Sequence, residues 1–256
     1  MGYTMKAAKI GKFLPVFAVL ALSACATPQA GQGTGGIYDP NEAANRRHHE
    51  FNKKLDRAVV RPVARTYVAV VPEGMRYNVS SFADFLGTPS SIVNQILQGD
   101  LSGAGRNTLR MAVNATVGFG GIADPASELG LTADPSDFGE TLYVWGAPEG
   151  AYKESLVTGP STQRDSVGSI VDLFLDPVGY LVPAPQKYYG TAIRLTAKVG
   201  DRGQFSDTVD GILYESADSY AQARLMYLQN RRFELGDTAA AAVEEADPFA
   251  LDTEGF

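Results

Sequence analysis

Cysteine and histidine are nearly absent: the 256 residues include one cysteine, Cys25, and two histidines, His48 and His49. A single cysteine excludes an internal disulfide, even in a compartment that would permit one. Adjacent residues of a helix point about 100° apart, so the two histidines are poorly placed to share a metal ion. His49-Glu50 also lacks the second histidine of a zinc protease motif. We therefore expect no metal site, no cofactor and no catalytic residues.

Basic charge and long apolar runs are also scarce. With 22 basic and 29 acidic residues, the chain has no electrostatic surface for nucleic acid. After residue 25 no apolar run reaches the ~18 residues of a membrane-spanning helix. The longest candidate, segment 58–71, is interrupted by Arg61, Pro62 and Arg65. No Gly-x-Ser-x-Gly motif is present, which argues against an ordinary α/β-hydrolase lipase.

The N-terminus has the pattern of a lipoprotein signal. Lys6, Lys9 and Lys12 precede the apolar segment 13–22, and Ser23, Ala24 and Cys25 follow it directly. A basic region before an apolar segment too short to span a bilayer is typical of a secretory signal. The alternative, an ordinary secretory signal followed by a buried cysteine, agrees less well with this order. We predict a signal peptide over residues 1–24 and a mature chain that begins at a lipidated Cys25.

Removal of this signal would leave 19 basic and 29 acidic residues, a net charge of −10, because residues 1–24 hold three lysines and no acid. Such a protein gains nothing from attraction to anionic headgroups, so contact between its body and a bilayer must come from apolar surface. Ala26 stands where an aspartate would favour retention at the inner membrane. We therefore predict sorting to the outer membrane of a Gram-negative bacterium, on the periplasmic face.

Composition divides the remaining chain into three parts. Residues 25–38 are rich in glycine and small polar groups and indicate a flexible tether. Gly31, Gly33 and Gly36 match a dinucleotide-binding spacing there, but they follow no strand, so we favour the linker interpretation. Residues 237–256 are alanine-rich and acidic and indicate a disordered tail. Residues 39–236 form the only predicted domain.

That domain shows helical rather than period-two spacing. Apolar residues recur at intervals of three and four, and proline follows an oxygen-bearing residue at several places, a combination that favours helix starts. The pairs begin at Asp39, Asp124, Asp134, Asp176, Asp247 and Thr88. Glu42 adds a capping-box pattern to the first pair, and the helix that includes Phe51 should stop or bend before Pro62. Asp137-Phe138-Gly139 is best interpreted as a helix start, and Gly99 as a C-cap. The expected fold is all-α, a single domain of many short amphipathic helices.

Ordered motifs along residues 39–172 resemble the VacJ/MlaA outer-membrane lipoproteins. The matching pieces, read from this sequence, are Asp39-Pro40 with Glu42, Asn45-Arg46, Phe51-Asn52, Leu55-Asp56, Arg61-Pro62-Val63-Ala64, Tyr67, Pro72, Pro89, Asn94, Leu97-Gln98-Gly99, Arg110, Val113-Asn114, Gly118, Gly120-Gly121, Asp124, Ala126, Asp137-Phe138-Gly139, Thr141-Leu142, Trp145-Gly146, Gly159-Pro160-Ser161-Thr162 and Arg164-Asp165. The chain departs from the family at Ala44, usually aromatic, and over segment 150–158, where Lys153-Glu154-Ser155 replaces an apolar, proline-bearing stretch.

The resemblance implies a non-enzymatic function. Family members are similar to helical rings that lie in the inner leaflet of the outer membrane around an amphipathic channel. They accept phospholipids mislocalised to the outer leaflet, pass them to a soluble periplasmic lipid carrier and associate with a trimeric porin. Two other functions remain open: an envelope phospholipase that uses His48 or His49, and a structural lipoprotein that tethers partners to the membrane.

Motif position and polarity suggest which residues would line such a channel. The glycine cluster Gly118, Phe119, Gly120 and Gly121 is expected to form a mobile part of the channel wall, with a tight interhelical turn as the alternative. Polar residues in the matched motifs are expected to contact lipid headgroups, and for the last two the alternative is a solvated helix face. They are Arg110, Asn114, Arg164 and Asp165.

Overall fold

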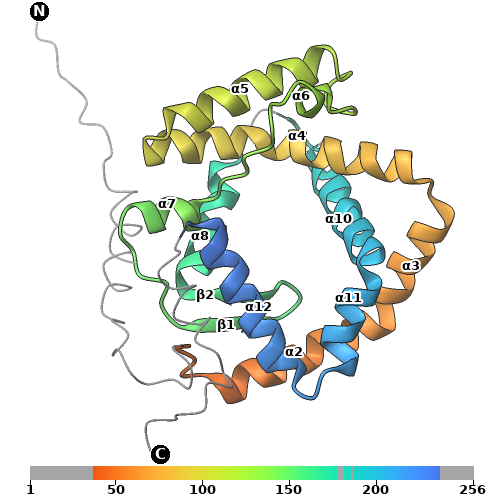
Figure 1. Ribbon diagram of the computed structural model, residues 1–256, viewed down its shortest axis with the longest axis vertical. Coiled ribbons are helices and arrows are strands. Elements are labelled where there is room, and N and C mark those ends of the chain that lie inside the picture. Colours follow the sequence, from red (N-terminus) through yellow and green to blue (C-terminus); the bar gives the residue numbers. More distant parts are fainter. Residues whose placement is uncertain (1–36, 178–181, 186, 237–256) are drawn as a thin grey trace, which may run out of the picture.

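Helices follow one another around a closed ring in the computed structural model, which describes residues 37–177, 182–185 and 187–236 (Figure 1). The elements are α2 (Glu42–Leu55), η3 (Asp56–Val60), α3 (Arg61–Val70), α4 (Glu73–Gln98), α5 (Leu101–Thr116), α6 (Pro125–Glu128), α7 (Phe138–Val144), β1 (Tyr152–Ser155), β2 (Gly159–Thr162), α8 (Gln163–Leu175), α10 (Lys187–Gln204), α11 (Ser206–Asp210), η4 (Gly211–Glu215) and α12 (Ser219–Glu234). The predicted all-α class is confirmed, apart from one hairpin that the sequence analysis missed.

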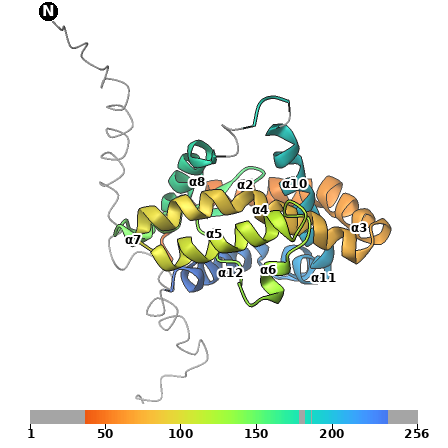
Figure 2. The ribbon, with the colours of Figure 1, turned by 90° about the horizontal axis from the view of Figure 1, so that it is seen from above.

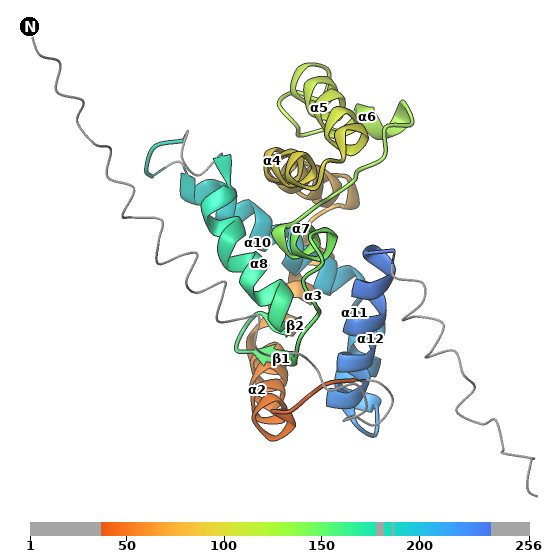
Figure 3. The ribbon, with the colours of Figure 1, turned by 90° about the vertical axis from the view of Figure 1, so that its left-hand side faces the viewer.

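The ring is flat. Seen from above, its helices lie in one slab, and only the end of α8 and the start of α10 project from one face (Figure 2). Viewed from the side, α8 and α12 lie on opposite sides of α7 and the β1–β2 hairpin (Figure 3). No helix among the described residues combines the length and apolar composition needed to cross a membrane.

The chain stays helical from Glu42 to Val70, but its hydrogen-bond pattern changes on the way. Asp56–Val60 is a π-helical turn, in which the Arg61 N–H donates to the Asp56 carbonyl five residues earlier. Pro62, near the start of α3, has no N–H to continue the preceding pattern. The interruption expected before Pro62 is therefore present, as a π-helical turn rather than as the end of a helix.

Several predicted caps are confirmed. Gly99 ends α4 with a φ of +79°, the left-handed conformation that glycine adopts at low cost. Asp124 caps α6 by accepting from the Ser127 N–H, and Asp137 caps α7 by accepting from the Glu140 N–H at 2.8 Å. A carboxylate in this position satisfies a backbone donor that the helix itself leaves free.

Other predicted helix starts are wrong. Helix α4 runs straight through Thr88-Pro89, and the Thr88 hydroxyl donates to the Asp84 carbonyl rather than capping a new helix. No helix begins at Asp134. The pair at Asp176 behaves differently: Asp176 ends α8, and the chain is helical again at Pro177, the last described residue of that segment, as the Asp-Pro pair predicts. Asn41, rather than Asp39, is the N-cap of α2, and its side chain makes no cap bond. The pair beginning at Asp247 lies outside the described residues.

The β1–β2 hairpin is the element that the sequence pattern did not predict. Strands β1 and β2 are antiparallel, with Tyr152 opposite Thr162 and Ser155 opposite Gly159. Tyr152 and Glu154 point inward and are almost fully buried. A charged residue at an inward position breaks the apolar alternation by which a short strand is recognised, and so this strand gave no signal.

The described chain buries polar residues and exposes apolar ones. Nine hydrophobic residues are buried against 17 polar or charged ones, whereas 27 large hydrophobic residues are exposed. Soluble proteins bury most of their large apolar side chains and rarely expose wide apolar patches. The most exposed apolar side chains, all at least 70% accessible, come from many parts of the ring: Val70, Leu101, Phe119, Leu129, Val157, Leu173 and Phe233. The accessible surface of the described ring is therefore unusually rich in large apolar side chains.

Polar bonds close the ring where its first and last helices meet. The Asn45 side chain donates to the Tyr152 carbonyl at 3.2 Å and accepts from the Glu154 N–H at 3.0 Å, which joins α2 to the hairpin. Asp39 accepts from the Tyr220 hydroxyl and from Arg224, which joins the segment before α2 to α12. Tyr152, Tyr220 and Leu228 form a small apolar cluster beneath these bonds.

Removal of the Asn45 side chain should open this junction. Asn45→Ala leaves the buried Glu154 N–H without its acceptor, and we expect a loss of about 3 kcal/mol in the free energy of unfolding, since each unsatisfied buried group costs roughly 1–3 kcal/mol. Denaturant unfolding of the purified protein in detergent measures this loss. Asn41→Ala is the control, because Asn41 is exposed and its side chain makes no cap bond; a change within about 0.5 kcal/mol is expected there. Equal effects of the two substitutions would contradict the role given to Asn45.

Candidate functional site

A polar cavity of about 580 Å³ lies where the hairpin meets the helices on either side of it. Its charged lining residues comprise three cations and three anions, and serine, threonine and asparagine side chains supply neutral polar groups. The lining is Asp137, Lys153, Ser155, Thr158, Pro160, Ser161, Asp165, Ser166, Ser169, Ile170, Lys198, Tyr227, Asn230, Arg231 and Glu234. A cavity with both signs of charge is suited to a group that itself carries both.

A second cavity, of about 400 Å³ and mainly apolar, lies on the other side of the hairpin. Pro160 of β2 lines both cavities. The hairpin therefore separates a polar space from an apolar one, so that a polar group and an apolar chain could lie on its two sides.

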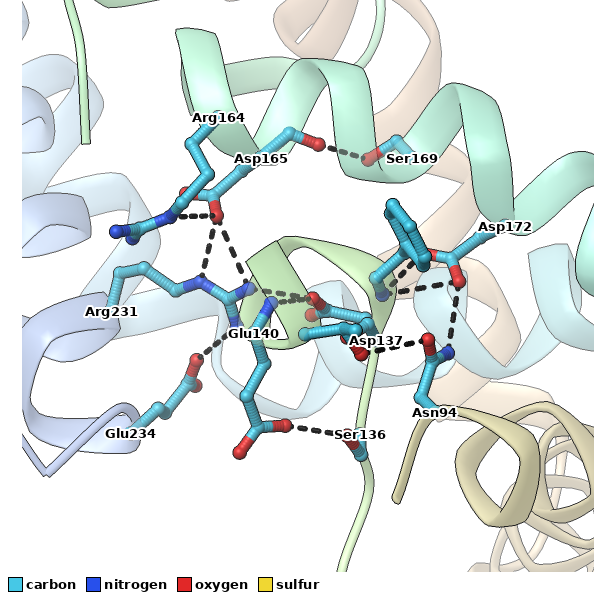
Figure 4. Close-up of polar contacts among 12 residues, drawn as sticks. Asn94, Ser136, Asp137, Glu140, Arg164, Asp165, Ser169, Asp172, Arg231 and Glu234 are labelled. Carbon is cyan, nitrogen blue, oxygen red and sulfur yellow. Dashed lines mark hydrogen bonds and ion pairs between the residues drawn. The ribbon is translucent and has the colours of Figure 1, made fainter. Parts of the chain in front are cut away.

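Asp165, at the start of α8, organises the wall of the polar cavity (Figure 4). One carboxylate oxygen is 3.2 Å from Nη2 of Arg231, and the other accepts from the hydroxyls of Thr162 and Tyr227, each at 2.8 Å. Arg231 also pairs with Asp137 at 2.7 Å. The cluster thus ties α7, α8, α12 and the hairpin together around one buried carboxylate.

The environment of Asp165 keeps it ionised. Burial by itself would raise the pKa of this carboxyl, but the charge of Arg231 and the hydrogen bonds from Thr162 and Tyr227 outweigh burial and hold its pKa below the usual range. Asp172, further along α8, shows the opposite balance: burial raises its pKa despite hydrogen bonds from the Phe138 N–H and from Asn94. Of these two carboxylates of α8, the one beside the arginine is stabilised in its charged form.

Arg164 lies beside Asp165 with much of its guanidinium enclosed by protein. Its Nε is 3.6 Å from the Asp165 carboxylate, an ion-pair distance but not a hydrogen bond, and its guanidinium carbon is 5.2 Å from the centre of the Tyr143 ring. Nε and Nη2 are buried and find no hydrogen-bond partner among the described residues. Arg164 and Asp165 are 6% and 7% accessible, so the solvated helix face considered for them is wrong.

Two glycines allow this cluster to assemble. A Cβ on Gly168 of α8 would overlap the backbone of Gly139 in α7, and a Cβ on Gly139 would be 2.7 Å from the Asp165 carboxylate. Only glycine at both positions lets the two helices approach closely enough for Asp137 and Asp165 to share Arg231. The Asp137-Phe138-Gly139 triplet is a helix start, as predicted, and its glycine has a packing role.

Arg110 and Asn114 lie in a different place, at the junction of α5 and α6. Arg110 pairs with Asp124 and donates to the Leu131 carbonyl at 2.5 Å, while Asn114 donates to Asp124 at 2.8 Å. Burial would raise the pKa of Asp124, but hydrogen bonds from Ser127, Asn114 and Arg110 lower it overall. These groups fix the loop between α5 and α6 and do not line the polar cavity. Their contact with a headgroup remains a prediction.

The glycine cluster forms the tight turn that leads from α5 towards α6. Gly120 and Gly121 have φ angles of +75° and +91°, and a Cβ on Gly121 would overlap the Phe85 ring of α4. Gly118 is enclosed as well, since a Cβ there would meet the backbone of Ala123 and Asn114. Phe119 is 81% accessible. The turn geometry agrees with the interhelical-turn alternative, and movement of this segment as a channel wall remains a prediction.

The contacts of His49 with a serine and a glutamate bear on the hydrolase alternative. Its Nε2 is 3.1 Å from the Ser219 hydroxyl, and its Nδ1 is 3.6 Å from the Glu154 carboxylate, too far for a hydrogen bond. Tyr152 and Asn52 donate to the two oxygens of Glu154 instead. A catalytic base needs a third group to fix its orientation, and Glu154 makes no hydrogen bond that would do so. His48 contacts the Glu154 carbonyl at 2.7 Å.

No group of three or more histidine, cysteine, aspartate or glutamate side chains within residues 37–177, 182–185 and 187–236 could hold a metal ion. Cys25, the predicted lipid attachment site, lies outside the described residues. Of the predicted site residues, the structure brings Arg164 and Asp165 to the polar cavity region, and Arg110, Asn114 and the glycine turn to the α5–α6 junction.

Sequence reasoning missed most of the cavity. Arg231, Tyr227 and Lys198 lie in α12 and α10, outside the recognised motifs. The only signal for Arg231 would have been an arginine on a helix that also carries apolar residues, which is too common to be informative. Lys153 was noted only as a departure from the family pattern.

A family model described as MlaA lipoprotein matches residues 37–234. The chain is 32% identical over 217 residues to the intermembrane phospholipid transport system lipoprotein MlaA of Escherichia coli, covering 83% of each chain. It is 27% identical over 241 residues to the protein of that name from Haemophilus influenzae, covering 91% of this chain and 93% of the relative. A solved structure described as the structural basis for maintenance of bacterial outer membrane lipid asymmetry matches with a TM-score of 0.67 and 31% identity, over 77% of this chain and 98% of that one.

Neutralisation of Asp165 should weaken the cavity wall in a pH-dependent way. Asp165→Asn is expected to cost about 2 kcal/mol of unfolding free energy near neutral pH, the scale of a hydrogen bond to a charged group. Because the folded pKa of Asp165 lies below the unfolded one, its contribution is present above about pH 4 and is lost as the pH falls through the folded pKa. The difference between variant and wild type should therefore shrink towards acid pH.

Thermal unfolding of both proteins at several pH values in detergent measures this difference. Asp207→Asn, at an exposed position of α11, is the control and should change stability by less than about 0.5 kcal/mol. A stability loss for Asp165→Asn that stays constant down to strongly acid pH would show that Asp165 does not act as a charge.

Proposed function

The chain belongs to the MlaA lipoprotein family, and we propose that it removes mislocalised phospholipids from the outer leaflet of the outer membrane and passes them to a soluble periplasmic carrier. In this way it maintains the lipid asymmetry of the membrane. The observation that carries the proposal is the pairing of a large exposed apolar surface with a charged cavity in one ring of helices.

The exposed apolar surface supports a position within the inner leaflet. The 27 exposed large hydrophobic side chains would each cost free energy in water, roughly 1.5–3 kcal/mol for a Val, Leu, Ile, Phe or Met side chain. Burial in acyl chains removes that cost, whereas attraction to anionic headgroups is excluded by the acidic composition. Leu173, Phe174 and Tyr189 lie at the α8 and α10 ends that project from the slab, which extends the apolar surface on that face (Figure 2).

The polar cavity supports passage of a headgroup. A phospholipid that crosses water exposes its acyl methylenes at about 0.8 kcal/mol each, and one that crosses a bilayer must desolvate its headgroup. A passage that offers ionic groups to the head and an apolar wall to the tails lowers both costs. Lys153 and Lys198 line the cavity and form no ion pair among the described residues, so their ammonium groups are available to a phosphate.

The proposed protein partners follow from the position of the ring in the inner leaflet. A ring held in one leaflet needs an acceptor on its periplasmic side, and the family implies a soluble lipid carrier there and a trimeric porin alongside. The transfer requires no covalent step, and the loose His49–Glu154 contact supports a non-enzymatic function. The rival phospholipase would release free fatty acid, and the rival tether would leave outer-leaflet phospholipid unchanged on deletion of the gene.

A bulky residue in the polar cavity should block transfer. Ser169 lines the cavity and donates to the Asp165 carbonyl four residues earlier. For Ser169→Trp we expect phospholipid transfer from donor vesicles to the carrier to fall about tenfold, as for loss of roughly 1.4 kcal/mol. Thr66→Trp is the control, because Thr66 is exposed on α3 and makes the same bond within its own helix.

Unchanged transfer by Ser169→Trp, in a protein that still folds, would contradict a passage through this cavity. Fatty acid or lysophospholipid measured in the same vesicles addresses the phospholipase. Products that appear with the wild type and disappear with His49→Ala would show that the protein is an enzyme.

Anchoring should depend on Cys25. Cys25→Ala removes the thiol that would take the diacylglycerol, so metabolic labelling with radioactive palmitate should label the wild type and not the variant. Stable anchoring requires at least two acyl chains, and the variant should leave the outer-membrane fraction unless the exposed apolar surface alone holds it. A labelled Cys25→Ala protein would contradict lipidation at this residue.

A further inference from the structure

We propose that the apolar cavity beside the hairpin receives one acyl chain of the transported phospholipid, and that Val157 is held at its mouth as the residue that selects which chains enter. This inference rests on the proposed function and adds to it the place of a lipid tail. It also assigns a role to segment 150–158, where the chain departs from its family.

The wall of the cavity is built for a hydrocarbon. Its volume of about 400 Å³ falls within the roughly 300–1,000 Å³ of small-molecule sites. Apolar side chains come from α2, η3, α11, η4 and α12, so the cavity lies between elements that are distant in sequence. They include Leu55, Val60, Val209, Ile212, Leu213 and Met226.

The acidic groups that border the cavity are already paired. Glu154 accepts from Tyr152 at 2.6 Å and from Asn52 at 3.3 Å. Asp56 accepts from Arg202 at 2.7 Å and from the Tyr214 hydroxyl at 2.6 Å. A water molecule is held in a cavity by two to four polar partners, and these acids have little capacity left. The remaining surface is better satisfied by methylene groups.

The position of the cavity points to a tail rather than to an unrelated apolar ligand. Pro160 lines this cavity and also the polar one, so the two spaces meet across a single residue of β2. A molecule whose charged head lies among Lys153, Asp165 and Arg231 can place one apolar chain past Pro160. Phospholipids have this construction, with a charged head and long chains joined at one end.

Val157 lines the apolar cavity in a conformation that its residue type disfavours. Its φ is +71°, in the left-handed region where a β-branched side chain is strained. Asn52 of α2 holds it there, because the Asn52 side chain accepts from the Val157 N–H at 2.8 Å and donates to the Ser155 carbonyl at 2.8 Å. Val157 is 71% accessible, so burial in a core does not account for the strain. A valine held at the mouth of an apolar cavity restricts what passes.

Photocrosslinking tests the proposal. The lipidated protein is placed in vesicles of phosphatidylethanolamine and phosphatidylglycerol with a trace of phospholipid that carries a diazirine at the end of one acyl chain. We expect crosslinks to map to segments 206–215 and 219–234, which contribute Ile212 and Met226 to the wall. For Ile212→Trp, which fills the cavity, we expect about tenfold fewer crosslinks there, as for roughly two methylenes denied burial. Leu109→Trp, at an exposed apolar position of α5, is the control and should leave crosslinking unchanged.

Val157→Gly tests the selective role without threatening the fold. Glycine adopts a φ of +71° without steric cost, so the melting temperature should stay the same or rise. With the side chain gone, the mouth should discriminate less between diazirine lipids with a short chain and with a long or branched chain. The ratio of their crosslinking yields should move towards one. An unchanged ratio would overturn the role of Val157. This test does not use Ile212→Trp, so it decides the matter even if that variant does not fold.

Failure of this inference and failure of the proposed function give different results. A wild-type protein that transfers phospholipid but crosslinks elsewhere, or an Ile212→Trp protein that folds and crosslinks normally, would overturn the acyl-chain site and leave transport intact. A wild-type protein that neither transfers nor crosslinks phospholipid would overturn both.

Discussion

Asn45 joins the first helix of the ring to the hairpin, and Asp39 joins the segment before that helix to the last one, through hydrogen bonds and an ion pair rather than through apolar packing. The rest of the structure depends on polar closures of this kind, because the described residues bury few large apolar side chains. In a low-dielectric setting such bonds are stronger than in water, and a group left unpaired is correspondingly costly. The ring is therefore held by specific pairings, each of which can be broken by one substitution.

This inverted distribution gives the protein both of its functional surfaces. Many polar side chains are buried and satisfy one another, while apolar side chains such as Leu173 and Phe233 are exposed, as the proposed contact with acyl chains requires. Buried and partly buried charges, led by Asp165 and Arg231, border a cavity of about 580 Å³. A phospholipid needs both environments at once, and the hairpin brings them within one residue of each other at Pro160. This arrangement of polarity is what the proposed transport of phospholipid requires.

Much of the local structure could be predicted, and the errors have physical causes. The Gly99 C-cap and the Asp124 and Asp137 N-caps depend on contacts within a few residues, and all three are confirmed. Thr88-Pro89 has the same local pattern but does not start a helix, because the Thr88 hydroxyl donates to the Asp84 carbonyl within a continuous α4. Asp39 fails as a cap because residues far along the chain, Tyr220 and Arg224, bind its carboxylate. Strand β1 was not predicted because the charged Glu154 occupies an inward position, where Asn52 of α2 and Tyr152 of β1 donate hydrogen bonds to it.

The sequence alone determined that the chain is helical, acidic and poor in catalytic or metal-binding residues, and that its motifs belong to an outer-membrane lipoprotein family. These properties follow from composition, spacing and residue order, which need no knowledge of distant contacts. Only the tertiary structure decided which face of each helix points outward, since helical spacing defines an apolar face but not whether that face meets protein or lipid. It also decided that Arg231 and Asp165, 66 residues apart, share one cavity wall. That pairing depends on the close approach of Gly139 and Gly168, which no local pattern encodes.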